Sequence, residues 1–287
     1  MNYIKLTTED CIHNGYQYKE GLNCLNGEFN NTMICGSGGL YFCREEDIYY
    51  WVHYNGKLMY YIWDVKLLND SKIVDMGNKL KTDKFILTNK RTIWDNEEIC
   101  KLIVKKNGNA LKYVPPELMT DEICKLAVQE NGLSLEYIEN HGLITDEICK
   151  LACIQNGLSL IFVKKQTEEI CKLAIKKNFN ALYYVKEQTD EICKFAVQQT
   201  GYALQFVKNK LMTDEICKLA CIQDGYALQY VPPELMTDEI CRLAIQQEGN
   251  ALKYVKSEFR NDEICRLAIQ QNINAIHYVP QEFTKDR

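Results

Sequence analysis

The sequence lacks an excess of basic residues, a long apolar run and an apolar N-terminal segment. Its 34 Lys and Arg face 39 Asp and Glu without a basic stripe. This balance argues against a nucleic-acid partner, whose backbone requires many cationic contacts. No apolar run reaches membrane-spanning length, so we expect no membrane partner. The opening residues MNYIKLTTED are too polar for a signal peptide, and we expect a cytoplasmic protein that is not secreted.

One reactive residue type is abundant, since the chain has fourteen cysteines. Eight of them recur at one position of a repeat inside an apolar segment, which favours small buried side chains in a reducing compartment over disulfides. The pairs Cys149/Cys153 and Cys217/Cys221 have helical spacing that suits two thiolate ligands. No histidine or further cysteine stands at ligand spacing beside them. We therefore expect neither a metal nor a cofactor.

A segment of the type TDEICKLA occurs eight times between Asn96 and Arg287 and organises two thirds of the chain. Neighbouring copies are 22 to 25 residues apart, a period typical of stacked-repeat proteins. The repeated cysteines are Cys100, Cys124, Cys149, Cys171, Cys193, Cys217, Cys241 and Cys265.

Each copy predicts two helical segments joined by a turn. A Thr or Asn four residues before the cysteine suits the N-cap, and the acidic residues after it suit the first turn. An Asn-Gly pair such as Asn131-Gly132 predicts a left-handed glycine after the first helix. Phe179 and Ile273 replace this glycine, so we expect those two turns to close differently. A second segment such as 110–114, Ala-Leu-Lys-Tyr-Val, predicts a helix of about two turns.

A single helix-turn-helix unit cannot bury its own apolar face, so neighbouring units must stack. The sequence therefore predicts an all-α solenoid of eight repeats over residues 94–287. Residues 1–93 contain no repeat and are rich in tyrosine and glycine. There we expect strands at 3–8, 40–43, 59–65 and 84–88 and a helix at 45–54, which together form a small α+β domain.

The repeat array resembles the short helical repeats of unknown function found in proteins of giant viruses, some bacteria and protists. The stretches HNGYQYKEGLN, GGLYF and KTDKFIL are similar to a domain that precedes ankyrin or other repeats in mimivirus-like proteins. The resemblance covers nearly the whole chain. It implies a giant-virus repeat protein, located in the host cytoplasm or the virion, and it implies no biochemical role.

A second resemblance concerns the order of segments in the first 93 residues, which is similar to the NAD-binding half of ADP-ribosyltransferases of the poly(ADP-ribose) polymerase type. It implies that His13 or His53 holds the NAD ribose, that Tyr41 packs near the nicotinamide and that Tyr50 stacks on it. The glutamate of that family is missing, because Lys84 stands at its place with Asp83 beside it. The alternative function is therefore an NAD-binding domain, active or degenerate, with repeats that select the target.

The positions that vary between copies are the candidates for recognition. A row of such positions lies along one side of a solenoid, where repeat proteins bind partners. Five of them are apolar, and exposed apolar patches tend to mark interaction sites: Ile154, Leu158, Tyr202, Ile222 and Tyr226. The other interpretation is that the next repeat partly buries them. No convincing catalytic set is present, so the favoured hypothesis is a non-catalytic protein–protein interaction scaffold.

Overall fold

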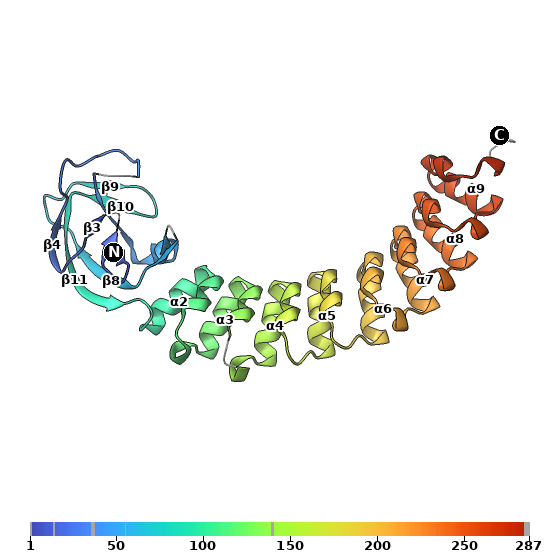
Figure 1. Cartoon of the computed structure of the whole chain (residues 1–287), viewed down its shortest axis with the longest axis horizontal. Helices are drawn as coiled ribbons and strands as arrows, with labels where there is room; N and C mark the ends of the chain where they lie inside the picture. The colour runs from blue at the N-terminus through green and yellow to red at the C-terminus, as the bar shows by residue number, and fades with distance from the viewer. Residues whose placement is uncertain (1, 14, 36–37, 55, 139–140, 284–287) are drawn as a thin grey trace. The chain divides into compact units, whose positions relative to one another are not determined.

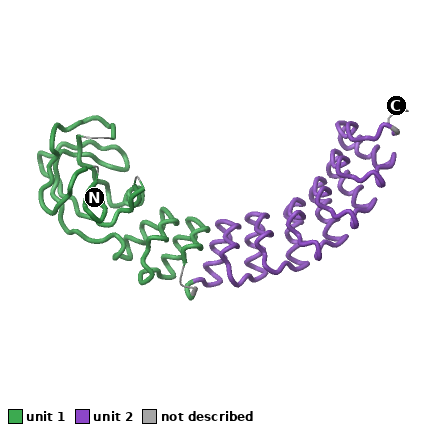
Figure 2. Tube along the Cα trace, in the orientation of Figure 1, with its two compact units in different colours: residues 1–143 green, residues 144–287 purple. Residues whose placement is uncertain are grey.

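The computed structural model describes residues 2–13, 15–35, 38–54, 56–138 and 141–283. The chain divides into two compact units, Met1–Leu143 and Ile144–Arg287 (Figure 2). The first unit holds a β-sheet region followed by two helical repeats, and the second unit holds helical repeats only (Figure 1). This confirms the predicted class, an α+β region followed by helical repeats. The expected domain boundary at residues 93–94 falls inside the first unit and stays a prediction.

An antiparallel sheet forms the centre of the first unit, and among the described residues seven strands join it. Their order is β4-β11-β8-β1-β5-β10-β9. Two short hairpins, β2-β3 and β6-β7, stand beside it. The strands are β1 Tyr3–Thr7, β2 Ile12–His13, β3 Tyr16–Gln17, β4 Gly21–Cys24, β5 Leu40–Arg44, β6 His53–Tyr54, β7 Lys57–Leu58, β8 Tyr61–Lys66, β9 Ile73–Asp75, β10 Leu80–Thr82 and β11 Lys84–Thr92.

Strand β1 lies at the middle of this sheet, paired with β8 on one side and β5 on the other. Its residues Ile4, Lys5, Leu6 and Thr7 are all buried, so both of its faces are covered. The Trp63 indole N–H donates to the Thr7 hydroxyl across 3.1 Å, which satisfies one buried polar group. A lysine in this strand is therefore held inside the unit rather than at its surface.

The expected helix at 45–54 is only partly right. A 3₁₀ turn, Glu45–Asp47, and a single α-helical turn, α1 Ile48–Trp51, occupy its first part. His53 and Tyr54 instead pair with Leu58 and Lys57 in the β6-β7 hairpin. This local strand pairing takes up the backbone groups that a continued helix would have used.

The first helix of each repeat forms as predicted and spans ten residues. These helices are α2 Glu97–Lys106, α3 Asp121–Glu130, α4 Asp146–Gln155, α5 Glu168–Lys177, α6 Asp190–Gln199, α7 Asp214–Gln223, α8 Asp238–Gln247 and α9 Asp262–Gln271. In every one, the predicted Thr or Asn N-cap side chain accepts a hydrogen bond from the backbone N–H three residues later. Acidic residues fill each first turn, where the helix dipole favours them.

The second segment of each repeat is a six-residue 3₁₀ helix, so the predicted two-turn α-helix is wrong there. These segments are Gly108–Tyr113, Gly132–Tyr137, Gly157–Phe162, Phe179–Tyr184, Gly201–Phe206, Gly225–Tyr230, Gly249–Tyr254 and Ile273–Tyr278. The residue before each is extended, and in several copies its side chain caps the 3₁₀ helix. Asn156, for example, accepts from the Leu158 N–H at 3.0 Å. A cap that begins a new helix leaves no room for the expected left-handed turn.

The predicted left-handed glycine is therefore also wrong. Among the described residues, the glycines with positive φ lie between Gly15 and Gly77, ahead of the repeats. The repeat glycines are needed for space: a Cβ on Gly225 would lie 2.3 Å from the backbone oxygen of Ala244 in the next repeat. Gly108, Gly157, Gly201 and Gly249 face the equivalent oxygen at 2.3 to 2.4 Å. Glycine thus allows one repeat to approach the backbone of its neighbour.

The two copies without glycine were expected to close differently, and this too is wrong, because both form the same six-residue 3₁₀ helix. Phe179 fits because the two repeats on either side of it lie further apart. The repeat of α5 packs more loosely on the repeat of α6 than the other neighbours in the second unit pack on each other, and Figure 1 shows the wider gap. Ile273 belongs to the repeat of α9, after which the described residues contain no further repeat.

Ion pairs between neighbouring repeats show the same interruption. The basic residue after the cysteine pairs with a glutamate of the next helix in Lys150–Glu169, Lys194–Glu215, Lys218–Glu239 and Arg242–Glu263. Among the described residues of α5 and α6, Lys172 pairs with Glu168 of its own helix and not with Glu191. The α5–α6 junction therefore lacks one of the contacts that join the other repeats of this unit.

The repeat cysteines lie in the core, as free thiols at most 4% exposed. Burial raises the pKa of Cys221 to about 12, so its thiol stays protonated. Among the described residues no cluster of three or more His, Cys, Asp or Glu side chains is placed to hold a metal. Nor does any helix there have the length and apolar content needed to cross a membrane.

Replacing Cys221 with serine should destabilise the second unit by about 1–3 kcal/mol, because a hydroxyl in this apolar site loses its water partners. Denaturant unfolding followed by the helical circular dichroism signal measures the change. Cys24→Ser, at an exposed position, is the control and should have little effect. Equal denaturant midpoints for Cys221→Ser and Cys24→Ser would contradict the interpretation that Cys221 stabilises the unit by packing in its core.

Candidate functional site

The five apolar positions expected to bind a partner all lie in the second unit, and they differ in exposure. Ile154 and Ile222, near the ends of α4 and α7, are 51% and 45% exposed. Leu158, Tyr202 and Tyr226 are half-buried. The two tyrosines contact the ring of a tyrosine in the following repeat, Tyr202 with Tyr230 and Tyr226 with Tyr254, at 6.5 and 6.3 Å between ring centroids.

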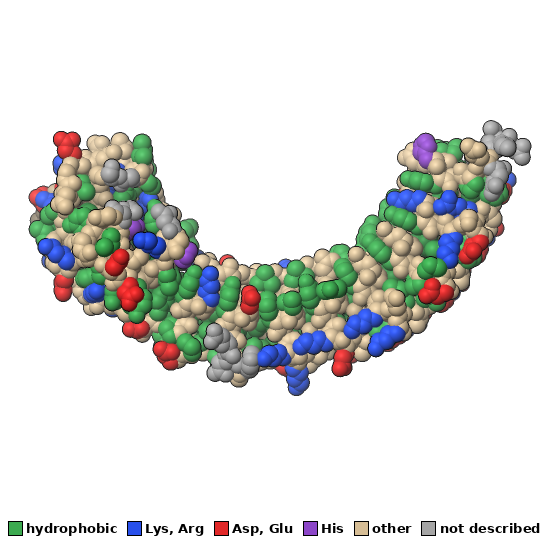
Figure 3. All heavy atoms as spheres, viewed as in Figure 1, with side chains coloured by type: hydrophobic (Ala, Val, Ile, Leu, Met, Phe, Trp, Pro, Cys, Tyr) green, Lys and Arg blue, Asp and Glu red, His purple; other side chains and the backbone are tan. Residues whose placement is uncertain are grey.

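Two further exposed apolar residues escaped the sequence analysis. Ile161 and Tyr183 are 50% and 68% exposed, and both stand at the variable third position of the Ala-Leu-x-Tyr-Val type segment. The other copies have Lys, Glu, Gln or His at this position, so the two apolar exceptions were a visible signal. Figure 3 shows hydrophobic side chains gathered over α4 and α5, the part of the unit where Ile154 and Ile161 belong.

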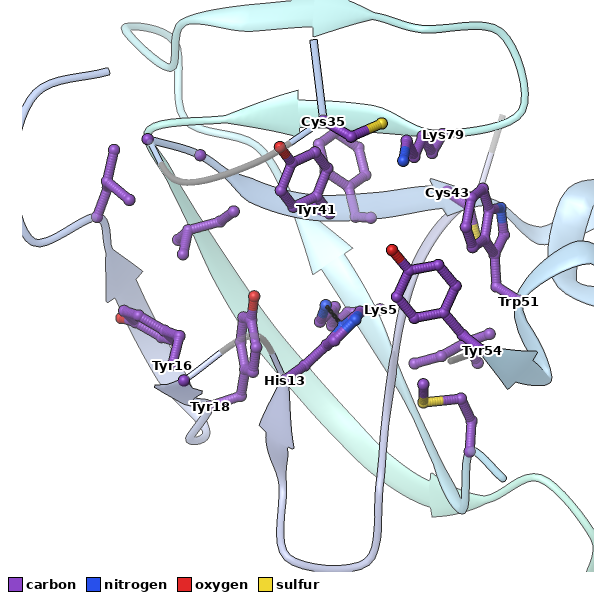
Figure 4. A pocket seen from close by; sticks show the side chains of 18 of the residues that line it. Lys5, His13, Tyr16, Tyr18, Cys35, Tyr41, Cys43, Trp51, Tyr54 and Lys79 are labelled. Atoms are coloured by element: carbon purple, nitrogen blue, oxygen red, sulfur yellow. Dashed lines mark hydrogen bonds between the residues drawn. The ribbon is translucent and has the colours of Figure 1, made fainter. Parts of the chain in front are cut away.

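A second candidate site is a cavity of about 560 Å³ in the first unit. Strands β1 and β5 form its floor, and β2, β3, α1 and β6 contribute side chains to its walls (Figure 4). Its size is in the range of pockets that hold small molecules. Apolar and aromatic side chains dominate its lining, with a few amino, imidazole and phenol groups among them.

Lys5 and His13 meet in this cavity, with 2.9 Å between Lys5 Nζ and His13 Nδ1. Lys5 comes from the central strand β1 and is only 2% exposed. Its burial lowers its pKa from 10.5 to about 7. Burial, together with the positive charges of Lys5, Lys79 and Lys57, lowers the pKa of His13 to about 3, so the imidazole is neutral at physiological pH.

Aromatic rings enclose these two groups. Lys5 Nζ lies 4.2 Å from the centroid of the Tyr18 ring, a cation–π contact. Tyr54 packs edge-on against His13 at 5.5 Å between ring centroids. On another side of the cavity, Lys79 Nζ lies 5.2 Å from the Tyr41 ring and 4.9 Å from the Trp51 ring. Figure 4 shows these side chains turned toward a common space.

The structure brings together two of the residues implied by the transferase resemblance, because His13 and Tyr41 both line the cavity. The others lie elsewhere. Tyr50 is half-exposed and contacts Tyr49, and the Asp83 carboxylate accepts a hydrogen bond from the Lys72 N–H. The alternative histidine, His53, stacks on Tyr113. Neither Tyr50 nor Asp83 is among the residues that line this cavity.

Comparison with known families identifies the repeats. Residues 96–143, 189–236 and 237–284 match the family described as domain of unknown function DUF4116. Together these three matches cover half of the chain.

Two relatives come from Acanthamoeba polyphaga mimivirus. The uncharacterized protein R869 is 48% identical over 54 residues, which are 18% of this chain and 39% of that protein. The putative ankyrin repeat protein R868 is 30% identical over 122 residues, which are 39% of this chain and 59% of that protein. The chain thus spans less than two thirds of the length of both relatives. No solved protein structure matches the chain.

Proposed function

Because the chain belongs to the DUF4116 family of domains of unknown function, we propose its function from its own surface, as a non-catalytic scaffold that binds a protein partner through the repeats. Repeat proteins present extended surfaces on a fixed core, and binding needs no catalytic residue. The similarity to a putative ankyrin repeat protein supports a recognition role for the repeats.

The observation that carries this proposal is the exposure of Ile154 and Ile222. At the same position the other copies have a lysine or a glutamine, whereas the cysteine five residues earlier never changes. An invariant core with apolar exceptions at one surface position is the pattern expected where a partner covers that position, because exposed apolar patches tend to mark interaction sites. Ile161 and Tyr183 extend the same pattern to a second surface position.

The charge of the chain supports a protein as the partner rather than a nucleic acid. The formal net charge is −5. When another protein buries exposed apolar side chains of this kind, the removal of their surface from water stabilises the complex by roughly 25 cal/mol per Å². The proposed contact residues are Ile154, Leu158, Tyr202, Ile222 and Tyr226, with Ile161 and Tyr183 added by the structure.

A photo-reactive amino acid at the exposed position 223, beside Ile222, tests this proposal in cells that express the protein. We expect an adduct of defined mass with one protein, and we expect Ile222→Lys to reduce its yield at least tenfold. The stability of the chain should change by no more than about 0.5 kcal/mol, as is usual for a surface substitution.

Gln246→Lys provides the matched control, because Gln246 occupies the same repeat position one copy later. It adds the same charge at an already polar position and should leave the adduct unchanged. If both variants lower the yield equally, the adduct reflects general charge and not recognition by Ile222. An adduct that survives Ile222→Lys would overturn the assignment of this residue to the contact surface.

A further inference from the structure

The cavity of the first unit plays no part in the proposed scaffold function, yet its polar groups are incompletely satisfied. His13 Nε2 is buried and has no hydrogen-bond partner among the residues that the structure describes. Buried polar atoms almost always have one, so an exception in a cavity points to a missing partner. The His13 side chain lines a cavity of about 560 Å³, and a small molecule bound there can supply that partner.

The partner must accept hydrogen bonds. In its ammonium form Lys5 can only donate, so in that form it is the donor in the Lys5–His13 contact. His13 Nδ1 is then the acceptor, and the single ring proton of the neutral imidazole resides on Nε2. The unpartnered atom is therefore an N–H donor, next to an amine that also donates.

The charge of the lining favours a negative group. Lys5, His13 and Lys79 line the cavity, and its described lining residues include no Asp or Glu. The ammonium form of Lys5 has the Tyr18 ring and the His13 ring nitrogen beside it, and no carboxylate of the described residues neutralises it. Transfer of a charge into such a site is unfavourable without an opposite charge, and an anionic ligand would provide it.

The walls favour a flat molecule. Tyr18, Tyr41, Trp51 and Tyr54 come from different segments and present rings to the same space. Aromatic rings stack on other planar rings with a gain beyond the area that they bury. A cavity of this volume holds a ligand of one or two fused or linked rings.

We propose that the cavity binds a small planar aromatic anion, with its negative group against Lys5 Nζ and His13 Nε2–H and its ring between the aromatic side chains. The inference is independent of the scaffold function of the repeats. It concerns reversible binding only, and it needs no bond to form or break.

Such binding must depend on pH in a defined way. An anion beside Lys5 stabilises its ammonium form, so each binding event above about pH 7 takes up a proton. Affinity then falls by up to tenfold per pH unit above pH 7. The groups that face Lys5 do not titrate in this window: His13 is neutral, burial raises the pKa of Cys43 to about 12, and burial also raises the pKa of Tyr18. Lys57 and Lys79 add positive charge that acts on His13.

Two fluorescent probes that differ in one group test the proposal on the full chain. 8-Anilinonaphthalene-1-sulfonate is an aromatic anion with a planar naphthalene ring, and N-phenyl-1-naphthylamine has the same rings without the sulfonate. We expect the sulfonate probe to bind at least tenfold more tightly at pH 7. Lys5→Met and His13→Phe should weaken the sulfonate probe tenfold or more while changing the neutral probe little.

Lys66→Met is the control for loss of a positive charge, since Lys66 is exposed on β8 and does not line the cavity. It should leave both affinities unchanged. The affinity of the sulfonate probe should fall between pH 7 and pH 9 in the wild-type chain and stay constant in Lys5→Met. Equal affinities for the two probes, no saturable binding of the sulfonate probe, or the same affinity in Lys5→Met would each overturn the proposal.

Discussion

Gly225→Val should destabilise the second unit by at least about 3 kcal/mol, which is large for one substitution. A Cβ at this position would lie 2.3 Å from the Ala244 backbone oxygen, and a backbone atom cannot rotate away as a side chain does. Two repeats must therefore separate, and the contacts between neighbours are what hold a solenoid together.

The distribution of tryptophan makes this effect measurable in the intact chain. All three tryptophans, Trp51, Trp63 and Trp94, belong to the first unit, whereas the second unit has none. The helical circular dichroism signal should melt at lower denaturant concentration in Gly225→Val. Tryptophan emission should report an unchanged transition of the first unit.

Phe179→Val supplies the matched control, because it places the same valine at the equivalent repeat position. The looser α5–α6 junction already accommodates a side chain there, so the substitution removes the Phe179–Phe206 ring contact without forcing the two repeats apart. We expect a cost of about 1 kcal/mol. Gly225→Asn separates close approach from backbone conformation, since asparagine tolerates positive φ. A mild effect of Gly225→Asn would favour a left-handed turn and contradict the close approach.

The repeats were predictable because their signals are local. A threonine or asparagine, two acidic residues and an apolar stripe act within one helix, and Thr120 caps α3 as expected. The role of the glycines was not predictable from one copy. The same Asn-Gly sequence is compatible with two structures. The glycine can end a helix in a left-handed conformation, or it can begin a 3₁₀ helix that packs closely against the next repeat. Only the position of Ala244 in the next repeat distinguishes the two.

The cavity was predictable only in part for a related reason. His13 and Tyr41 were singled out by resemblance, but Lys5 was not, because in Tyr3–Thr7 a lysine between two apolar residues is typical of a solvent-facing strand position. Side chains from other segments, such as His13 of β2 and Tyr18 of the loop after β3, lie over that face of β1 and bury the amine. Burial of this kind depends on tertiary contacts that no sequence period encodes.

Lys5→Met should stabilise the first unit and remove much of the pH dependence of its stability. The pKa of Lys5 is 10.5 in the unfolded chain and about 7 in the folded one. Between these values the unfolded state binds one more proton, so stability rises with pH by up to about 1.4 kcal/mol per unit. Below pH 7 both states are protonated, and the folded state bears the full cost of a buried ammonium.

Methionine has a similar length and no charge, so at pH 7 the variant should gain on the order of 4 kcal/mol in the free energy of unfolding of the first unit. Tryptophan emission during denaturant unfolding at pH 7, 8 and 9 measures it. The wild-type midpoint should climb with pH across this series, while the Lys5→Met midpoint should stay level. Lys66→Met should keep the wild-type slope, because that side chain is exposed.

The same variant should also improve stability in acid. His13 has a folded-state pKa of about 3, so the unfolded state binds more protons between pH 3 and 6.5 and stability falls as the pH drops through that window. Burial is the main cause of this shift and the charge of Lys5 is the next. Without Lys5 the pKa of His13 should rise toward its ordinary value, and the midpoint should fall less steeply below pH 6. An unchanged slope on both the acid and the alkaline side would show that Lys5 is hydrated rather than buried.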